Sequence, residues 1–478
     1  MKSPQSLSSA RTASRRATIA ISFIALATAA ILFVSSGSFE DKQLVRAAQS
    51  ALRRSDGVAR LISAMPTAQA TAQEGVQCEW QPAASSMTFS AAMALRQQAA
   101  AVNAANQSAP GGTIDFSQRK PIRIIRDNYA AFSSVAVDHK NDEVVLTDEN
   151  LFQILVYDRK ANTPPQAAMT EPKRILGGEK TEIEFQCGLY IDPKNGDIYG
   201  VNNDTVDQLV IFSRNARGNV PPDRMLHTPH GTFGIAVDEQ EQEMFLTIQH
   251  DHAVVVYDKY ATGETNPKRL IQGDKTLLAD PHGIAIDTKN RLIFVTNYGS
   301  TSTKVKGRGE QRPNFPLETV VPGSGRNLPP SITVYPMDAV GDVAPVRIIR
   351  GPKTKLNWGT GISIDSERGE IFIANDMTSE VLVYDVNANG DAAPKRILAG
   401  PKTMIQSPTA VYADVVNDEL WVTNFGNHTA TVYRRNAGGD TAPLRVIRSA
   451  PIGSPAPMMG NPHPVAYDTK RDQILVPN

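Results

Sequence analysis

Histidines provide the most suggestive chemistry in this sequence, because imidazole is the commonest metal ligand and the usual acid–base group near neutral pH. His282, His463 and Cys187 share one position in a repeated unit, five residues before a recurrent Asp. A thiolate and two imidazoles suit zinc or another divalent cation, with a fourth position left open for water. The alternative is that these polar side chains only surround a solvated opening. On the metal hypothesis, His230 and His428 are candidate acid–base groups.

Further candidates for ligand binding lie at the end of the second hydrophobic run of the repeat and in the turn that follows it. Short amides end the second hydrophobic run of several repeats, where they either line a pocket or hydrogen-bond the backbone of the turn that comes next. Two more histidines lie in the same kind of turn. The candidate ligand-binding residues are His250, His252, Asn297, Asn375 and Asn424.

The unit that positions these residues is repeated along residues 113–478. It contains a short run ending in Asp, a second run, a third run ending in an aromatic residue, and Pro-x-Arg followed by two aliphatic residues. Each run is four to six residues long, rich in β-branched and aromatic side chains and bounded by turn residues, which predicts strands. We name the four strands a, b, c and d. The strand-a aspartates are Asp138, Asp192, Asp238, Asp287, Asp365, Asp414 and Asp468.

Four short strands per roughly 50 residues predict an all-β fold, a β-propeller. The last repeat stops after strands a and b, whereas 113–116 and 121–125 have the pattern of strands c and d. We therefore expect seven blades, the last of them closed by two N-terminal and two C-terminal strands. The arginines of strand d recur on outermost strands, which favours a structural role between blades over anion binding. They are Arg123, Arg174, Arg224, Arg269, Arg347, Arg396 and Arg445.

This strand order places the d–a and b–c connections on one face of the ring, here called the top face. Seven of the eight histidines fall in those connections, and His139 falls in an a–b turn. One repeat is about 29 residues longer than the others, because of an insertion at 299–331 between strands b and c of blade 4. It is rich in Pro, Gly and basic residues, so we expect a mobile loop on the top face. It is a lid, an arm for an acidic partner, or a neutral insertion.

Residues 1–38 have the pattern of a signal peptide or signal anchor: four basic residues, then an apolar run over 17–34. Basic residues before a single apolar run predict export of the rest of the chain, whether the run is cleaved or stays in the membrane. Residues 39–112 are rich in Ala, Ser and Gln and are interpreted as a spacer. The expected location is therefore extracytoplasmic, in the periplasm or at the cell surface, either membrane-anchored or secreted.

The composition excludes two function classes. The 478 residues contain 49 basic and 49 acidic side chains, without the basic excess that general nucleic-acid binding requires. Two cysteines cannot build a disulfide scaffold or a four-thiolate zinc site.

The repeats resemble the NHL-type propellers of bacterial exported proteins. The resemblance covers 113–478 and is carried by 281–287 with 292–297 and by 361–365 with 371–375. Such propellers include binding scaffolds, lyases and lactonases, so the resemblance implies a fold and does not select an activity. We expect a scaffold that binds a small molecule or a protein at its top face. The alternative is a metal-dependent lyase or lactonase-like hydrolase at the channel mouth.

Overall fold

The computed structural model describes residues 127–203, 206–306, 318–457, 466–468, 470 and 473–475. The apolar run at 17–34, the spacer, the strands expected at 113–125 and His463 lie outside the described residues. Within the described part of the chain, no helix is long and apolar enough to cross a membrane.

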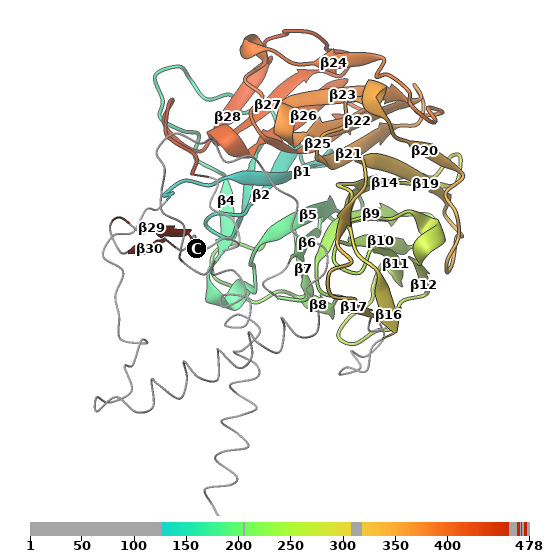
Figure 1. Cartoon of the computed structure of the whole chain (residues 1–478). Helices are drawn as coiled ribbons and strands as arrows, with labels where there is room; N and C mark the ends of the chain where they lie inside the picture. The colour runs from blue at the N-terminus through green and yellow to red at the C-terminus, as the bar shows by residue number, and fades with distance from the viewer. Residues whose placement is uncertain are drawn as a thin grey trace, which may run out of the picture. The chain divides into compact units, whose positions relative to one another are not determined.

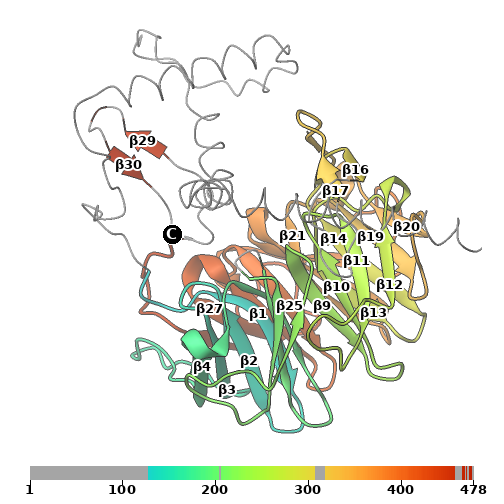
Figure 2. The ribbon, with the colours of Figure 1, turned by 90° about the horizontal axis from the view of Figure 1, so that it is seen from below.

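Six four-stranded antiparallel sheets are arranged in a ring, as expected for a β-propeller (Figures 1 and 2). In every sheet the strands follow the order a, b, c, d from the centre outwards, which confirms the predicted repeat. Blades 1 to 3 are formed by β1 (Phe132–Asp138), β2 (Glu143–Asp148), β3 (Gln153–Asp158) and β4 (Arg174–Gly177); β5 (Gln186–Ile191), β6 (Ile198–Asn202), β7 (Gln208–Phe212) and β8 (Arg224–His227); and β9 (Thr232–Asp238), β10 (Glu243–Ile248), β11 (Ala253–Asp258) and β12 (Arg269–Gln272).

Blades 4 to 6 repeat the arrangement, with the insertion of blade 4 between its strands b and c. They are formed by β13 (Pro281–Asp287), β14 (Leu292–Asn297), β19 (Ser331–Pro336) and β20 (Arg347–Ile349); β21 (Gly359–Asp365), β22 (Glu370–Asn375), β23 (Glu380–Asp385) and β24 (Arg396–Leu398); and β25 (Pro408–Asp414), β26 (Glu419–Asn424), β27 (Thr429–Arg434) and β28 (Arg445–Arg448).

Short 3-10 turns begin four of the d–a connections and two of the b–c connections. In the d–a turns a Gly-x-Lys-Thr sequence recurs: the Thr hydroxyl donates to the Gly carbonyl, as from Thr354 to Gly351 at 2.6 Å. The Lys353 amide N–H donates to Asp391 of the next blade at 2.7 Å. This repeat therefore links neighbouring blades. The turns are η2 (Glu179–Thr181), η3 (Asp274–Thr276), η4 (Pro352–Thr354), η5 (Asp376–Thr378), η6 (Pro401–Thr403) and η7 (Phe425–Asn427).

The ring closes after six blades in the described residues, which corrects the expectation of a seventh blade between the last and the first. The inner strand β1 packs against both β5 and β25. One apolar cluster joins blade 6 to blade 1 and contains the fully buried Trp421 beside Phe132 and Leu146. The strands expected to supply the C-terminal half of a seventh blade, β29 (Ala466–Asp468) and β30 (Gln473–Leu475), pair with each other as a separate two-stranded sheet.

Ion pairs show that the closing contact repeats the contact between other blades. In blade 5, Glu370 at the start of strand b binds Arg396 of its own strand d and Arg435 of blade 6, the latter at 2.8 Å. Across the closure, Glu419 binds Arg445 at 2.9 Å and Arg159 of blade 1 at 3.0 Å. The strand-d arginines of these blades thus have the structural role predicted for them. Since blades 6 and 1 meet like blades 5 and 6, there is no room for a sheet between them.

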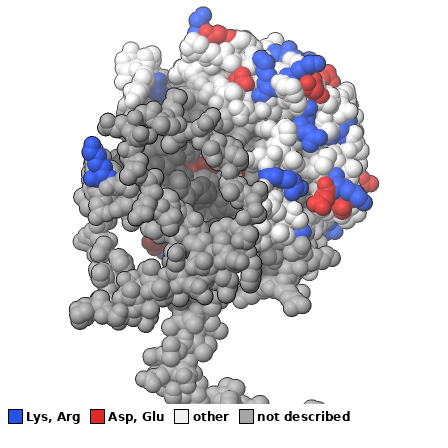
Figure 3. Space-filling model, in the orientation of Figure 1, with Lys and Arg blue, Asp and Glu red and all other residues white. Residues whose placement is uncertain are grey.

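The described residues of the blade 4 insertion, for which the sequence predicted a mobile loop, form a two-stranded ribbon. Its pairs are β15 (Ser300–Thr301) with β18 (Arg326–Asn327) and β16 (Lys304–Lys306) with β17 (Glu318–Val320). Figure 2 shows β16 and β17 projecting beyond β14 and β19. Lys304 anchors the ribbon to blade 3 through Asp251, at 3.3 Å. Acidic and basic side chains are mixed over the described part of the surface in Figure 3.

Candidate functional site

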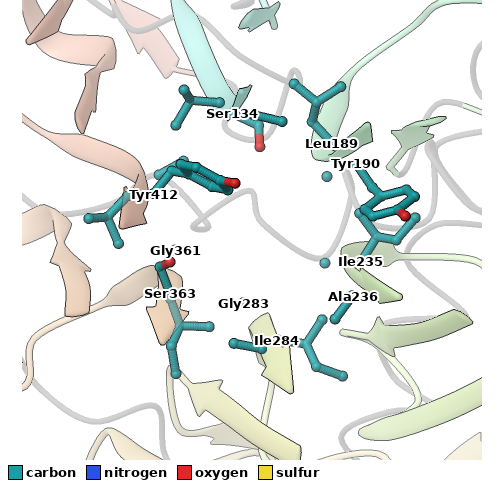
Figure 4. Close-up of a pocket in the computed structure, with 18 of the residues that line it drawn as sticks. Ser134, Leu189, Tyr190, Ile235, Ala236, Gly283, Ile284, Gly361, Ser363 and Tyr412 are labelled. Atoms are coloured by element: carbon teal, nitrogen blue, oxygen red, sulfur yellow. The ribbon is translucent and has the colours of Figure 1, made fainter. Parts of the chain in front are cut away.

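The six inner strands surround a cavity of about 300 Å³ along the axis of the ring. Its wall is made mainly of small and aliphatic residues, with a few hydroxyl groups. Figure 4 shows Tyr190 and Tyr412 on opposite sides of the cavity and Ser134 and Ser363 on its wall. A polar ligand group would find more partners at the mouth than along this wall.

The top mouth of the cavity is formed by two sets of residues at matched registers. The first set contains the positions predicted from the sequence: Ser133, Cys187, Phe233, His282, Thr360 and Thr409. The second set comes directly after each strand b, and it contains Glu149, Asn203, Gln249, Tyr298, Asp376 and Phe425.

A thiol and a carboxyl group from blades 2 and 1 meet at this mouth. Cys187 Sγ donates to Glu149 Oε1 at 3.3 Å, and Cys187 is buried. Burial disfavours the carboxylate and raises the pKa of Glu149 to about 8. Near neutral pH this carboxyl group is therefore largely protonated.

Aromatic rings from blades 3, 4 and 5 form a row beside this pair. Phe233 contacts His282, with ring centroids 4.4 Å apart. His282 stacks on Tyr298, and Tyr298 stacks on Trp358 with centroids 4.9 Å apart. The Tyr298 hydroxyl and the Thr360 hydroxyl are hydrogen-bonded at 2.6 Å. The row thus extends from the buried His282 to a solvent-exposed indole.

Trp358 is 46% exposed and adopts a left-handed backbone conformation, with φ of 57°. The equivalent residues Asp280 and Ser407 have similar φ values of 55° and 43°. Short polar side chains tolerate this region better than a bulky aromatic residue does. An exposed tryptophan at this position is therefore unexpected from turn preferences alone.

A second carboxyl group stands next to Trp358. The amide N–H of Asp376 donates to the Trp358 carbonyl at 3.0 Å. Burial raises the pKa of Asp376 to about 6, against a hydrogen bond from Ser407 that lowers it. Asp376, which comes from blade 5, also raises the pKa of Glu149 of blade 1 electrostatically.

The structure brings two of the three predicted metal ligands, Cys187 and His282, to the same mouth, and His463 lies outside the described residues. The ring nitrogens of His282 face the Gln249 amide nitrogen at 2.7 Å and the Asp280 carbonyl at 3.0 Å. No group of three His, Cys, Asp or Glu side chains that could hold a metal ion occurs among the described residues. The metal hypothesis therefore has no complete ligand set in the part of the chain that the structure describes.

Two of the other histidines form a stacked pair further out on the top face. His230 and His250 have ring centroids 5.0 Å apart, and His230 Nδ1 lies 2.9 Å from Asp207 Oδ1. His252 Nδ1 accepts the Asp280 amide N–H at 3.1 Å. Burial and the nearby Lys304 lower the pKa of His252 to about 4, so its ring is neutral at physiological pH.

His428 occupies the junction between blade 6 and the segment that precedes β1, away from the mouth. Its ring is buried, with Nδ1 3.1 Å from the Ala130 carbonyl and Nε2 3.2 Å from the Pro455 carbonyl. A histidine held by backbone groups on both sides ties these segments together. Nε2 also lies 3.4 Å from Asp127 Oδ2, and the role of His428 as an acid–base group stays a prediction.

The predicted amide ligands are buried and bind the turn backbone, which is the alternative that the sequence left open. Asn297 Oδ1 accepts the Ala279 N–H at 3.0 Å. Asn375 Oδ1 accepts the Asn357 N–H at 2.8 Å, and Asn424 accepts that of Gln406 at 3.3 Å. All three side chains lie at most 1% exposed. Through these hydrogen bonds they hold the connections that carry the mouth residues, and their role in ligand binding stays a prediction.

Sequence reasoning missed the four residues that now stand out at the mouth: Glu149, Tyr298, Trp358 and Asp376. Three of them come after the last residue of strand b, at the register next to Asp148, Asn297 and Asn375. Aligning the repeats on the end of strand b would have placed them on the top face. Their types differ from blade to blade, so no repeated motif marks them.

Fold and site together define the described residues as a six-bladed β-propeller whose top mouth is lined by acids, a thiol and aromatic rings. No family model and no curated protein matches the chain. It is similar in fold to a chain of a nidogen/laminin complex, with 13% identity, 68% of this chain and 95% of that chain covered, and a TM-score of 0.42. It is also similar to hydrazine synthase of Kuenenia stuttgartiensis, with 11% identity, coverages of 68% and 99%, and a TM-score of 0.43. At this distance neither likeness bears on function.

Proposed function

We propose that this chain is a binding module of the NHL-like propeller kind, located outside the cytoplasm, and that it takes a small ligand at the top mouth. The observation that carries the proposal is the convergence of side chains from blades 1, 2, 4 and 5 over one cavity. Cys187, Glu149, Tyr298 and Asp376 are close enough to influence each other's ionisation. Extracytoplasmic location rests on the residues before position 39 and is part of the same proposal.

The acids and the exposed indole at the mouth favour ligand binding over a purely structural role. Glu149 and Asp376 are half-buried and have no ion pair to a Lys or Arg among the described residues. Burying an ionisable group without a counter-charge costs free energy. Trp358 offers an exposed aromatic surface next to them. Pockets with a few polar groups converging beside aromatic side chains are the usual form of small-molecule sites.

The proposal is tested with the full chain labelled with 5-fluorotryptophan. A library of cationic, anionic and neutral polar compounds is screened by 19F NMR. We expect saturable ligands to shift the Trp358 resonance and to leave that of the buried Trp421 unchanged.

Replacement of Trp358 by Ala should weaken binding of such ligands about tenfold or more, a change of at least ~1.4 kcal/mol. The matched control is Tyr260→Ala, which removes another exposed aromatic side chain, 53% accessible, from a c–d connection on the opposite face. If every saturable ligand leaves the Trp358 signal unshifted, or if Y260A weakens binding and W358A does not, the top mouth is not the binding site.

A further inference from the structure

The top mouth holds two carboxyl groups that the described residues leave without a basic partner. Glu149 accepts the Cys187 thiol, and Asp376 accepts the Ser407 hydroxyl. Neither acid has an ion pair with Lys or Arg in this part of the chain, whereas the buried Glu243 and Glu370 are bound by arginines. The mouth therefore differs from these arginine-paired positions, and its two acids resemble the buried Asp148 and Asp287, which also have no Lys or Arg ion pair among the described residues.

An aromatic surface accompanies these two carboxyl groups. The indole of Trp358 is the outermost ring of the stack, and its inner face is covered by Tyr298. The backbone carbonyl of Trp358 accepts the amide N–H of Asp376. The indole ring and the Asp376 carboxyl group therefore belong to residues in direct contact. An aromatic face beside a carboxylate attracts cations through the ring quadrupole as well as by charge, most strongly for indole.

Resting on the proposed function, we propose that the ligand carries an organic cation, an ammonium or quaternary ammonium group, bound between Glu149 and Asp376 and against Trp358. A neutral polyol would supply no counter-charge to either carboxyl group, and an anion would be repelled by them once they are ionised. A metal ion would need a third ligating group, which the described residues do not bring together here. The apolar part of the ligand would enter the adjoining cavity.

Proton release is a consequence of this assignment. A carboxyl group must be ionised to pair with a cation, whereas burial holds the pKa of Glu149 at about 8 and that of Asp376 at about 6. Affinity should therefore rise by about tenfold or more from pH 6 to pH 9. Three other titratable groups face Glu149: Cys187, Asp148 and Asp376. The variant Glu149→Gln therefore shows how much of the rise in affinity comes from ionisation of Glu149 itself.

The experiment compares two probes of equal shape by isothermal titration calorimetry on the full chain. Choline carries the trimethylammonium group, and 3,3-dimethyl-1-butanol is its neutral isostere. We expect choline to bind at least tenfold more tightly than the isostere at pH 8 and to shift the fluorotryptophan signal of Trp358. Glu149→Gln and Asp376→Asn should each weaken choline about tenfold, and E149Q should flatten the pH dependence.

The matched control is Asp274→Asn, which removes an exposed acid from another connection of the top face. It should leave choline affinity unchanged, and thermal unfolding shows whether each variant is folded. Equal binding of the two probes would overturn the cation assignment, as would stoichiometric calcium or zinc binding lost in E149Q. In those cases a neutral ligand that shifts Trp358 would still support the proposed function, whereas no Trp358 response to any compound would contradict both.

Discussion

Replacing Gly283 by Ala is expected to lower the free energy of unfolding by about 3 kcal/mol, because the added methyl group would collide with the next blade. A Cβ at Gly283 would lie 2.4 Å from the Thr360 carbonyl oxygen, which belongs to the neighbouring inner strand. Backbone cannot move aside as a flexible side chain does. The four residues Gly188, Gly234, Gly283 and Gly361 occupy this register, where the inner strands approach each other most closely.

Urea unfolding of the full chain measures this effect. The control is Gly325→Ala in the insertion of blade 4, where an added Cβ meets nothing within 4 Å and the backbone is not left-handed. It should change stability by less than about 0.5 kcal/mol. If G283A is as stable as G325A, the inner strands do not approach each other as closely as this contact requires. If G283A does not fold, the yield of folded protein relative to G325A gives the same comparison.

Replacing Lys259 by Met is expected to cost about 3 kcal/mol at pH 7, because two carboxylates would lose their buried counter-charge. Lys259 Nζ lies 2.7 Å from Asp192 and also binds Glu239; its side chain is 0% exposed and that of Asp192 3% exposed. Burial lowers the pKa of Lys259, but the hydrogen bonds to these acids outweigh burial and raise it. The stabilisation by a raised lysine pKa is complete below about pH 10 and is lost only as pH rises further.

Lys194→Met is the control for this variant. Lys194 reaches the same Glu239 at 3.5 Å, but its side chain is 63% exposed. An exposed pair of this kind contributes about 0.5 kcal/mol or less. The difference between K259M and K194M should shrink as pH falls from 7 to 4, since protonation of the abandoned acids removes their unpaired charge. Equal stabilities of the two variants at pH 7 would show that Lys259 is not buried between these acids.

Most of the architecture could be predicted from the repeated unit. The four-strand order, the two faces and the structural arginines are consequences of the short runs of β-branched and aromatic residues and of the recurrent Asp and Pro-x-Arg markers. The number of blades could not be predicted from the repeats, because a strand pattern at 113–125 looks the same whether or not those strands join the ring. Closure depends on whether Arg159 reaches Glu419, a contact between residues 260 positions apart.

The candidate site was predictable as a location and less so as chemistry. The register of Cys187, Phe233 and His282 identified the mouth, because position in a repeat fixes position around the axis. Which groups meet above it depends on side chains from different blades, such as Glu149 against Cys187. These pairings require the curvature of the ring and leave no motif. A residue type that suits ligand binding can also have a backbone partner: the buried Asn297 accepts a hydrogen bond from the backbone N–H of Ala279.

The stability coupling between Arg159 and Glu419 tests most directly that the ring closes after six blades and so creates this mouth. A double-mutant cycle with Arg159→Met and Glu419→Gln, measured by urea unfolding, should give an interaction energy of about 2 kcal/mol. The cycle for Arg435 and Glu370 at the equivalent contact should give a similar value, since the paired atoms are 2.8 Å apart there and 3.0 Å apart at the closure. Additive effects of R159M and E419Q, with coupling retained between Arg435 and Glu370, would contradict closure after six blades.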